Sequence, residues 1–180
     1  MAVLQLVLGP DPILKQKAAP VSEITEEIKT IVGDMFDTLY ERRGLGIGAN
    51  MVGILKRIVV IDLQENGEKS PVACINPEIT WSSDKLETRE EASLCFPGIS
   101  AEVKRPDSIK VQYQDLEGNK QEIEAEGWLA TVLQHEIEYL DGKVYLDHLS
   151  KMKRDRLIKK MQKQIRSHSC GDPDCGHDHH

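Results

Sequence analysis

The sequence of 180 residues contains neither a long apolar run nor a recognisable targeting segment. Its longest apolar stretches, such as Ile58 to Ile61, are far too short to cross a bilayer. The N-terminus, from Met1 to Gln5, lacks the basic region and the full apolar segment of a signal peptide. We therefore expect a protein of the cytoplasm or of an organelle interior, with no membrane partner.

Cysteine is also scarce, and the four cysteines do not form the dense, evenly spaced framework of a secreted disulfide scaffold. Reduced thiols are the expected state. The formal net charge of −7 argues against a protein that coats nucleic acid along its whole surface. There is no internal repeat, and a hydrophobic content of 39% is enough for the core of one domain at this length.

Two periodicities alternate along the chain. Apolar residues recur at helical spacing from Thr25 to about Arg43, and Gly44 ends that amphipathic helix. The middle of the chain is rich in strands, because the β-branched run around Val59 is followed by shorter apolar segments and by a hairpin turn at Gly118. The helical period returns from Trp128 onward. The pattern predicts an α+β fold.

The segment from Gln134 to Gly142 nearly matches the His-Glu-x-x-His helix of zinc hydrolases. In that pattern, residues four apart share one helix face, so two imidazoles bind one metal while the glutamate handles protons. His135 and Glu136 are present on the predicted helix, and Tyr139 stands where the second histidine is expected.

Two further segments extend the likeness. Gly44 to Gly53 is similar to the pattern GxGΦAAxQ, with Met51 at the glutamine position, and Glu91 to Gly98 is similar to EGCLSxPG. In the second segment Ser93 stands at the cysteine position and Cys95 at the serine position. Together with the QHE segment, these motifs resemble those of the peptide deformylases, over roughly residues 3 to 166.

The resemblance implies a fold of mixed, mostly antiparallel sheets around the central helix, with an N-terminal amphipathic helix and a basic C-terminal helix. It implies an Fe or Zn ion held by the residues at positions 93, 135 and 139, with Glu136 as proton shuttle. It further implies an oxyanion site at Met51 and the backbone N–H of Leu94, and a substrate pocket at Gly46 and Gly48. The implied substrate is an N-formylmethionyl peptide in protein biosynthesis.

Each substituted position permits two interpretations. Tyr139 is either a phenolate ligand of iron or a buried tyrosine with a satisfied hydroxyl. Cys95 is either a replacement ligand or an inert thiol, and a shift of about 6.6 Å along a strand favours the second interpretation. Ser93 is a hard, reluctantly ionised ligand. Glu136 is either a proton shuttle or a glutamate bonded to local backbone.

The oxyanion site is also altered, because a thioether at Met51 cannot donate a hydrogen bond. Loss of one such donor typically lowers the rate by about 10² to 10³. Thr131, where many deformylases carry arginine, is a further departure of uncertain effect. The glycines of the motifs are equally explained by tight turns.

Two C-terminal segments differ in composition from the rest. A predicted helix from about Ser150 to Ser167 is rich in lysine and arginine, and we expect it either to contact the ribosome or a nascent peptide or to be a solvated helix face. We divide the chain into a domain at residues 1–166 and a disordered tail at residues 167–180. The tail offers a Zn²⁺ or Ni²⁺ site, or only adventitious affinity, through six residues: His168, Cys170, Cys175, His177, His179 and His180.

Three functions compete at this point. The leading hypothesis is a deformylase-like pseudoenzyme that has no metal in the domain and binds peptide N-termini or the ribosome. The alternative is an active metal-dependent hydrolase that removes the formyl group with an atypical ligand set. The third is a metal store built on the tail. The oligomeric state is left open.

Overall fold

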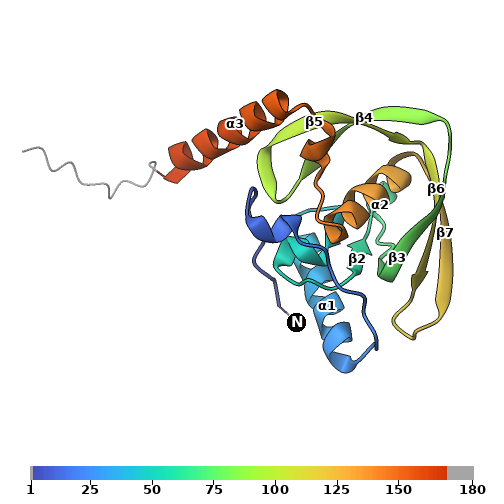
Figure 1. The fold of residues 1–180 in the computed structure, drawn as a ribbon. Helices are drawn as coiled ribbons and strands as arrows, with labels where there is room; N and C mark the ends of the chain where they lie inside the picture. The colour runs from blue at the N-terminus through green and yellow to red at the C-terminus, as the bar shows by residue number, and fades with distance from the viewer. Residues whose placement is uncertain (1, 170–180) are drawn as a thin grey trace, which may run out of the picture.

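The computed structural model describes residues 2–169 (Figure 1). Three α-helices, seven strands and four short 3-10 helices make up this part of the chain. In chain order they are η1 (Pro12–Lys15), α1 (Glu26–Glu41), β1 (Gly46–Gly48), η2 (Ala49–Val52), β2 (Ile58–Ile61), η3 (Glu65–Gly67), β3 (Val72–Ser82), β4 (Leu86–Ser93), β5 (Phe96–Pro106), β6 (Ser108–Gln114), β7 (Lys120–Glu126), α2 (Gly127–Leu140), η4 (Tyr145–His148) and α3 (Lys151–Ser169).

Helix α1 begins with a capped first turn. The side chain of Thr25 accepts a hydrogen bond from the backbone N–H of Ile28 at 3.3 Å, and Glu26 and Glu27 lie where the helix dipole favours negative charge. The apolar face predicted from the spacing is buried and consists of Ile28, Val32, Met35, Thr38 and Leu39. This helix therefore covers one side of the core.

A five-stranded antiparallel sheet forms the larger layer, in the order β1-β2-β3-β6-β7. All four residues of β2 are buried, as its β-branched composition predicts. Strands β6 and β7 form the predicted hairpin. Strand β3 is continuous from Val72 to Ser82, with register shifts that join the two short strands expected in this region.

The smaller layer is the hairpin of β4 and β5. No strand was predicted from Phe96 to Pro106, and the acidic stretch from Asp84 to Glu91 was interpreted only as leading into the segment at Ser93. Both segments are strands because they pair with each other over their whole length. Leu94 and Cys95 form the turn between them, so Ser93 and Cys95 do not lie two apart on one strand, contrary to the expectation.

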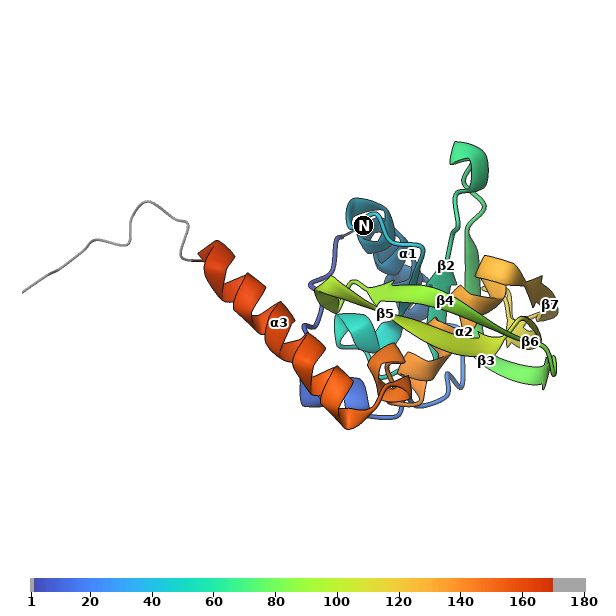
Figure 2. The ribbon, with the colours of Figure 1, turned by 90° about the horizontal axis from the view of Figure 1, so that it is seen from above.

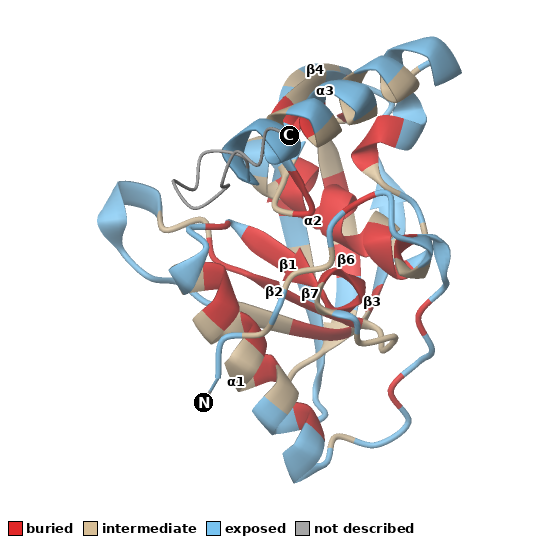
Figure 3. Cartoon of the chain, turned by 90° about the vertical axis from the view of Figure 1, so that its left-hand side faces the viewer, coloured by how far each residue is buried: buried red, intermediate tan, exposed pale blue. Residues whose placement is uncertain are grey.

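Helix α2 lies between the two layers and contacts β1, β2 and β7 of the large sheet and β5 of the small one (Figure 1). Most of its residues are buried, which Figure 3 shows as an almost continuous red segment. The predicted α+β arrangement of antiparallel sheets around this central helix is confirmed. A helix in this position presents its side chains to both layers at once.

Helix α3 packs along β5: Met161 is fully buried, and a Cβ at Gly98 would meet the side chain of Gln164. Only the C-terminal end of the helix extends beyond the body of the molecule (Figures 1 and 2). The helix continues to Ser169, so residues 167–169 of the predicted tail are helical. The remaining residues of that tail lie outside the described range. Among residues 2–169, no helix combines the length and the apolar character that crossing a membrane requires.

Candidate active site

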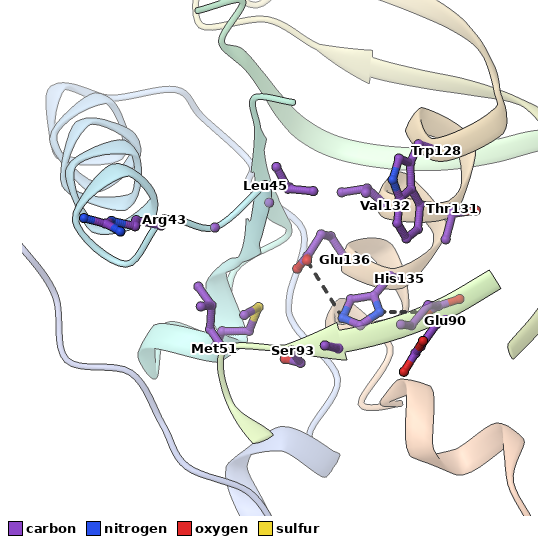
Figure 4. A pocket seen from close by; sticks show the side chains of 15 residues that line it. Arg43, Leu45, Met51, Glu90, Ser93, Trp128, Thr131, Val132, His135 and Glu136 are labelled. Atoms are coloured by element: carbon purple, nitrogen blue, oxygen red, sulfur yellow. Dashed lines mark hydrogen bonds and ion pairs between the residues drawn. The ribbon is translucent and has the colours of Figure 1, made fainter. Parts of the chain in front are cut away.

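A pocket of about 360 Å³ opens between β1, the end of β4 and α2 (Figure 4). Its size is within the range of small-ligand sites. Apolar side chains and carboxylates share its wall. The lining residues are Arg43, Gly44, Leu45, Gly46, Met51, Glu90, Glu91, Ala92, Ser93, Leu94, Trp128, Thr131, Val132, His135 and Glu136.

His135 projects from α2 and is held on its inner side by Glu91 of β4. Its Nδ1 lies 2.9 Å from Oε1 of Glu91, and its ring stacks on Tyr145 with centroids 5.4 Å apart. Burial tends to raise the pKa of Glu91, but hydrogen bonds from His135 and Arg105 outweigh it and hold that pKa below its usual value. Because an ionised carboxylate only accepts, Nδ1 is the donor and Nε2 is the ring nitrogen left for the pocket.

Arg105 of β5 extends this contact into a charged network behind the pocket. Its guanidinium donates to both oxygens of Glu91, at 2.7 and 2.9 Å, and to both oxygens of Glu138, at 2.7 and 3.1 Å. The ring of His148 lies 2.8 Å from Glu138 on the outer side. We call Glu91, Arg105, Glu138 and His148 the charged network. It orients His135 from three elements of the fold.

Glu136 faces the pocket one residue further along α2. Its Oε2 accepts a hydrogen bond from the backbone N–H of Gly48 at 3.0 Å, and its Oε1 lies 4.0 Å from Nε2 of His135. Burial raises the pKa of this carboxyl above its usual value. A Cβ at Gly46 would approach Cγ of Glu136 to 2.9 Å, so glycine at this position makes room for the glutamate. Gly46 lines the pocket, whereas Gly48 lies behind it.

Tyr139, one turn after His135, reaches across to β4. Its hydroxyl lies 2.5 Å from the hydroxyl of Ser93, and its side chain is fully buried. Burial raises the pKa of the phenol well above its usual value, so the phenol is protonated. The backbone N–H of Cys95 also donates to Oγ of Ser93, at 3.2 Å. We call Ser93, Cys95 and Tyr139 the neutral cluster.

Cys95 is completely buried in the turn before β5. Its Sγ lies 4.0 Å from the carbonyl oxygen of Met51, and burial raises the pKa of the thiol to about 12. Such a thiol stays protonated and is a poor nucleophile and a poor ligand. The expectation of a partly buried, inert thiol agrees with this environment, except that burial is complete.

Met51 and Leu94, the two positions at which the resemblance implies an oxyanion site, both line the pocket. The sulfur of Met51 accepts a weak contact from the backbone N–H of Gly48 at 3.4 Å, and Leu94 lines the pocket from the hairpin turn. Since Gly48 also donates to Glu136, the thioether adds an acceptor where the resemblance implies a donor. Thr131 lies at the wall, where its hydroxyl accepts from Arg89 at 3.3 Å.

The side chains at positions 93, 135 and 139 do not fit a resident metal ion. Two of the three are hydroxyls that hydrogen-bond to each other, and only His135 is a good ligand. Within residues 2–169, His, Cys, Asp and Glu side chains form no group of three that could hold a metal ion. Of the tail candidates, His168 is an exposed residue of α3 whose Nδ1 lies 2.7 Å from the carbonyl of Gln164, and the other five lie outside the described residues.

Sequence reasoning did not assign a role to Glu91, Arg105, Trp128 or Arg43. Glu91 appeared only as the first residue of a motif, and its role is recognisable once the structure places its carboxylate against His135. Trp128 stands at the pocket rim with 48% of its surface exposed, and an exposed tryptophan at the start of a core helix is informative only once the pocket is known.

The comparisons with known proteins agree on one family. A family model described as Polypeptide deformylase matches residues 3–155. A "Peptide deformylase-like" protein of Rickettsia conorii is 54% identical over 91% of this chain and 90% of its own length. A "Peptide deformylase" of Brucella suis is 46% identical over 91% and 94%. The crystal structure of peptide deformylase from Ehrlichia chaffeensis superposes with a TM-score of 0.89 at 39% identity, covering 93% of this chain and 99% of that one.

Proposed function

The chain belongs to the polypeptide deformylase family, and on that premise we propose that it binds peptide N-termini in its pocket without metal-dependent hydrolysis. The hydrogen bond between Ser93 and Tyr139 carries the proposal. It joins the two positions at which the family resemblance implies metal ligands. A neutral contact between two hydroxyls satisfies both groups and leaves no anionic ligand for a divalent cation.

The binding half of the site supports the same proposal. Leu45, Val132 and Trp128 give the pocket an apolar wall that suits an aliphatic first side chain (Figure 4). Strand β1 is the edge strand of the large sheet, and β4 pairs with β5 on one side only. Both edges border the pocket, so an extended peptide backbone can hydrogen-bond between them.

The experiment is a deformylation assay on N-formyl-Met-Ala-Ser with the full chain, reconstituted in turn with Fe²⁺, Ni²⁺ and Zn²⁺. We expect no rate above that of buffer with the same metal. Isothermal titration with tripeptides that begin with methionine should nevertheless show saturable binding. Turnover that is lost with a chelator and restored by one of these metals would contradict this proposal and show that the chain is a metal-dependent hydrolase.

A second candidate function is that of an active metal-dependent hydrolase that removes the formyl group with an atypical ligand set. The names of the relatives at 42–46% identity, "Peptide deformylase", and the retained Glu136 favour it. It requires one equivalent of metal, Fe or Zn, in protein whose six tail candidates are all replaced, the cysteines by serine and the histidines by alanine. Tyr139 or Cys95 would then have to bind the ion, after the hydrogen bond between Ser93 and Tyr139 breaks.

We further propose that α3 is a contact surface for the ribosome. Seven of its eight basic residues are exposed, and Arg154 is partly buried and pairs with Asp147 at 3.3 Å. The C-terminal end of the helix extends beyond the domain (Figure 2). Asp155, which pairs with Lys151 at 2.8 Å, is the acidic residue of this helix. The basic side chains are Lys151, Lys153, Arg154, Arg156, Lys159, Lys160, Lys163 and Arg166. Such a surface suits RNA phosphates, and a location in the cytoplasm or an organelle interior stays a prediction.

Co-sedimentation with ribosomes tests this contact. Binding should weaken as salt rises, and the double variant Lys159→Glu with Lys160→Glu should weaken it further and lower the salt dependence. Lys120→Glu, an exposed change on β7 far along the chain from α3, is the matched control. Binding that is insensitive to salt and to the double variant would contradict the proposal. The Zn²⁺ or Ni²⁺ site on the tail is a separate prediction, tested by titration of the full chain against C170S with C175S.

A further inference from the structure

Two hydrogen-bond acceptors face the pocket side by side. Nε2 of His135 is an acceptor in the neutral imidazole because Nδ1 donates to Glu91, and Oε1 of Glu136 lies 4.0 Å away from it. The other oxygen of Glu136 already accepts from Gly48. Among residues 2–169, no side chain or backbone group donates a hydrogen bond to either of the two facing atoms. The pair therefore requires a partner that brings at least two hydrogens.

In the described part of the chain, Glu136 has no cationic side chain as a hydrogen-bond partner, unlike Glu91 and Glu138. Glu91 and Glu138 share the guanidinium of Arg105, whereas Glu136 has only a backbone N–H and the neighbouring imidazole. Arg43 also lines the pocket but points away from Glu136 in Figure 4. A ligand cation between Glu136 and His135 would supply the missing positive charge.

We propose that the pocket selects the free α-ammonium group of a peptide over its formylated form. An ammonium group has three N–H donors and a positive charge, so it can donate to Nε2 of His135 and to Oε1 of Glu136 together. A formylated N-terminus has one N–H and a carbonyl oxygen. Neither facing atom can donate to that oxygen while His135 is neutral, and the sulfur of Met51 cannot do so either. Leu94 lines the pocket and its backbone N–H can donate to the formyl oxygen, but the formyl group still offers the acceptor pair only one N–H and no charge.

The surrounding pocket argues for a peptide terminus and not for an isolated amine. The apolar wall of Leu45, Val132 and Trp128 lies on the same side as the acceptor pair, and the backbone of β1 and of the end of β4 borders the opening. A first residue with an aliphatic side chain can fill the 360 Å³ while its backbone continues along the strand edges. This inference rests on the proposed function and narrows it to deformylated or unmodified N-termini.

Isothermal titration of the full chain with Met-Ala-Ser and with N-formyl-Met-Ala-Ser tests the inference, at about pH 7, where imidazole in water is mostly neutral and an α-amino group is mostly protonated. We expect the free-amine peptide to bind at least about tenfold more tightly, as for a hydrogen bond to a charged group. Glu136→Gln should abolish this preference, because it keeps an acceptor for Gly48 but removes the charge. Glu124→Gln removes an exposed carboxylate of β7, paired with Lys110, and should leave the preference unchanged.

The outcomes separate the two proposals. Equal or tighter binding of the formylated peptide overturns the selection of the ammonium group and leaves N-terminal binding intact. A preference that persists in Glu136→Gln also overturns it. Absence of binding by either peptide overturns the proposed function itself, and the inference with it.

Discussion

The buried polar groups on the two sides of His135 find their hydrogen-bond partners in different ways. On one side the charged network, made of Glu91, Arg105, Glu138 and His148, pairs every buried charge with a partner on another element. On the other side the neutral cluster of Ser93, Cys95 and Tyr139 holds β4 to α2 through hydroxyls and a thiol. His135 and Tyr139 are one turn apart on the same helix, so the two environments meet within α2.

The two environments differ in whether their residues stand at positions where the family resemblance implies metal ligands. A buried ion pair cannot lose one partner without leaving an uncompensated charge, which typically costs about 3–5 kcal/mol. The charged network has its full set of partners within the chain. The neutral cluster, in contrast, occupies the positions where the family resemblance implies ligands, and its members need only each other. Substitution there is compatible with a stable fold.

The largest expected effect is the conversion of the neutral cluster into a metal site. Ser93→Cys with Tyr139→His should bind one equivalent of Fe²⁺ or Zn²⁺, because it supplies a thiolate and a second imidazole beside His135. Addition of Met51→Gln should then raise the rate of deformylation by about 10² to 10³ through a restored oxyanion donor. Metal content by mass spectrometry and turnover of a formylated tripeptide are the measurements.

Two controls accompany this conversion. In all variants the six tail candidates are also replaced, the two cysteines by serine and the four histidines by alanine, so that metal on the tail is not counted. Ser93→Cys alone should bind much less metal, because the Tyr139 side chain still fills the adjacent space. If the double substitution binds no metal although it folds, the neutral cluster does not occupy the ligand positions.

The charged network should be the more costly of the two environments to break. Arg105→Met leaves the carboxylates of Glu91 and Glu138 without their shared guanidinium, and we expect the free energy of unfolding to fall by about 3–5 kcal/mol. Urea denaturation at neutral pH measures it. Lys110→Met removes an exposed pair with Glu124 and should cost less than about 1 kcal/mol. A loss below that control value would show that the network contributes little.

The neutral cluster should show a smaller but coupled effect. Ser93→Ala leaves the buried hydroxyl of Tyr139 without its partner, at a cost of about 1–3 kcal/mol. Tyr139→Phe should cost less, because the part-buried hydroxyl of Ser93 keeps the hydrogen bond from Cys95, and the double variant removes both hydroxyls. The double variant should therefore cost less than the sum of the two single variants. A double-mutant cycle by urea denaturation measures the coupling. Additive losses would mean that the hydroxyls of Ser93 and Tyr139 do not stabilise each other.

The sequence predicted this contrast in part. Helical periodicity located α1 and α2, and the resemblance carried by the motifs placed Ser93, His135 and Tyr139 at one site. The pairing of Arg105 with Glu138 was not predicted, because it depends on how β5 crosses α2 and no local pattern encodes that crossing. The turn at Cys95 was missed for a similar reason. Strand β5 alternates weakly and is recognisable only from its pairing with β4.

The smallest expected effect lies at the outer end of the charged network, where His148 meets solvent. Its ring nitrogen lies 2.8 Å from Glu138, but 37% of its side chain is exposed and Glu138 keeps both contacts to Arg105 when the ring is removed. His148→Ala should therefore lower the free energy of unfolding by less than about 1 kcal/mol, as for other exposed pairs. The same urea assay compares it directly with Arg105→Met. A loss as large as that of Arg105→Met would mean that the exposed His148 is as important for stability as the buried Arg105. The charged network would then not be stabilised mainly by its buried contacts.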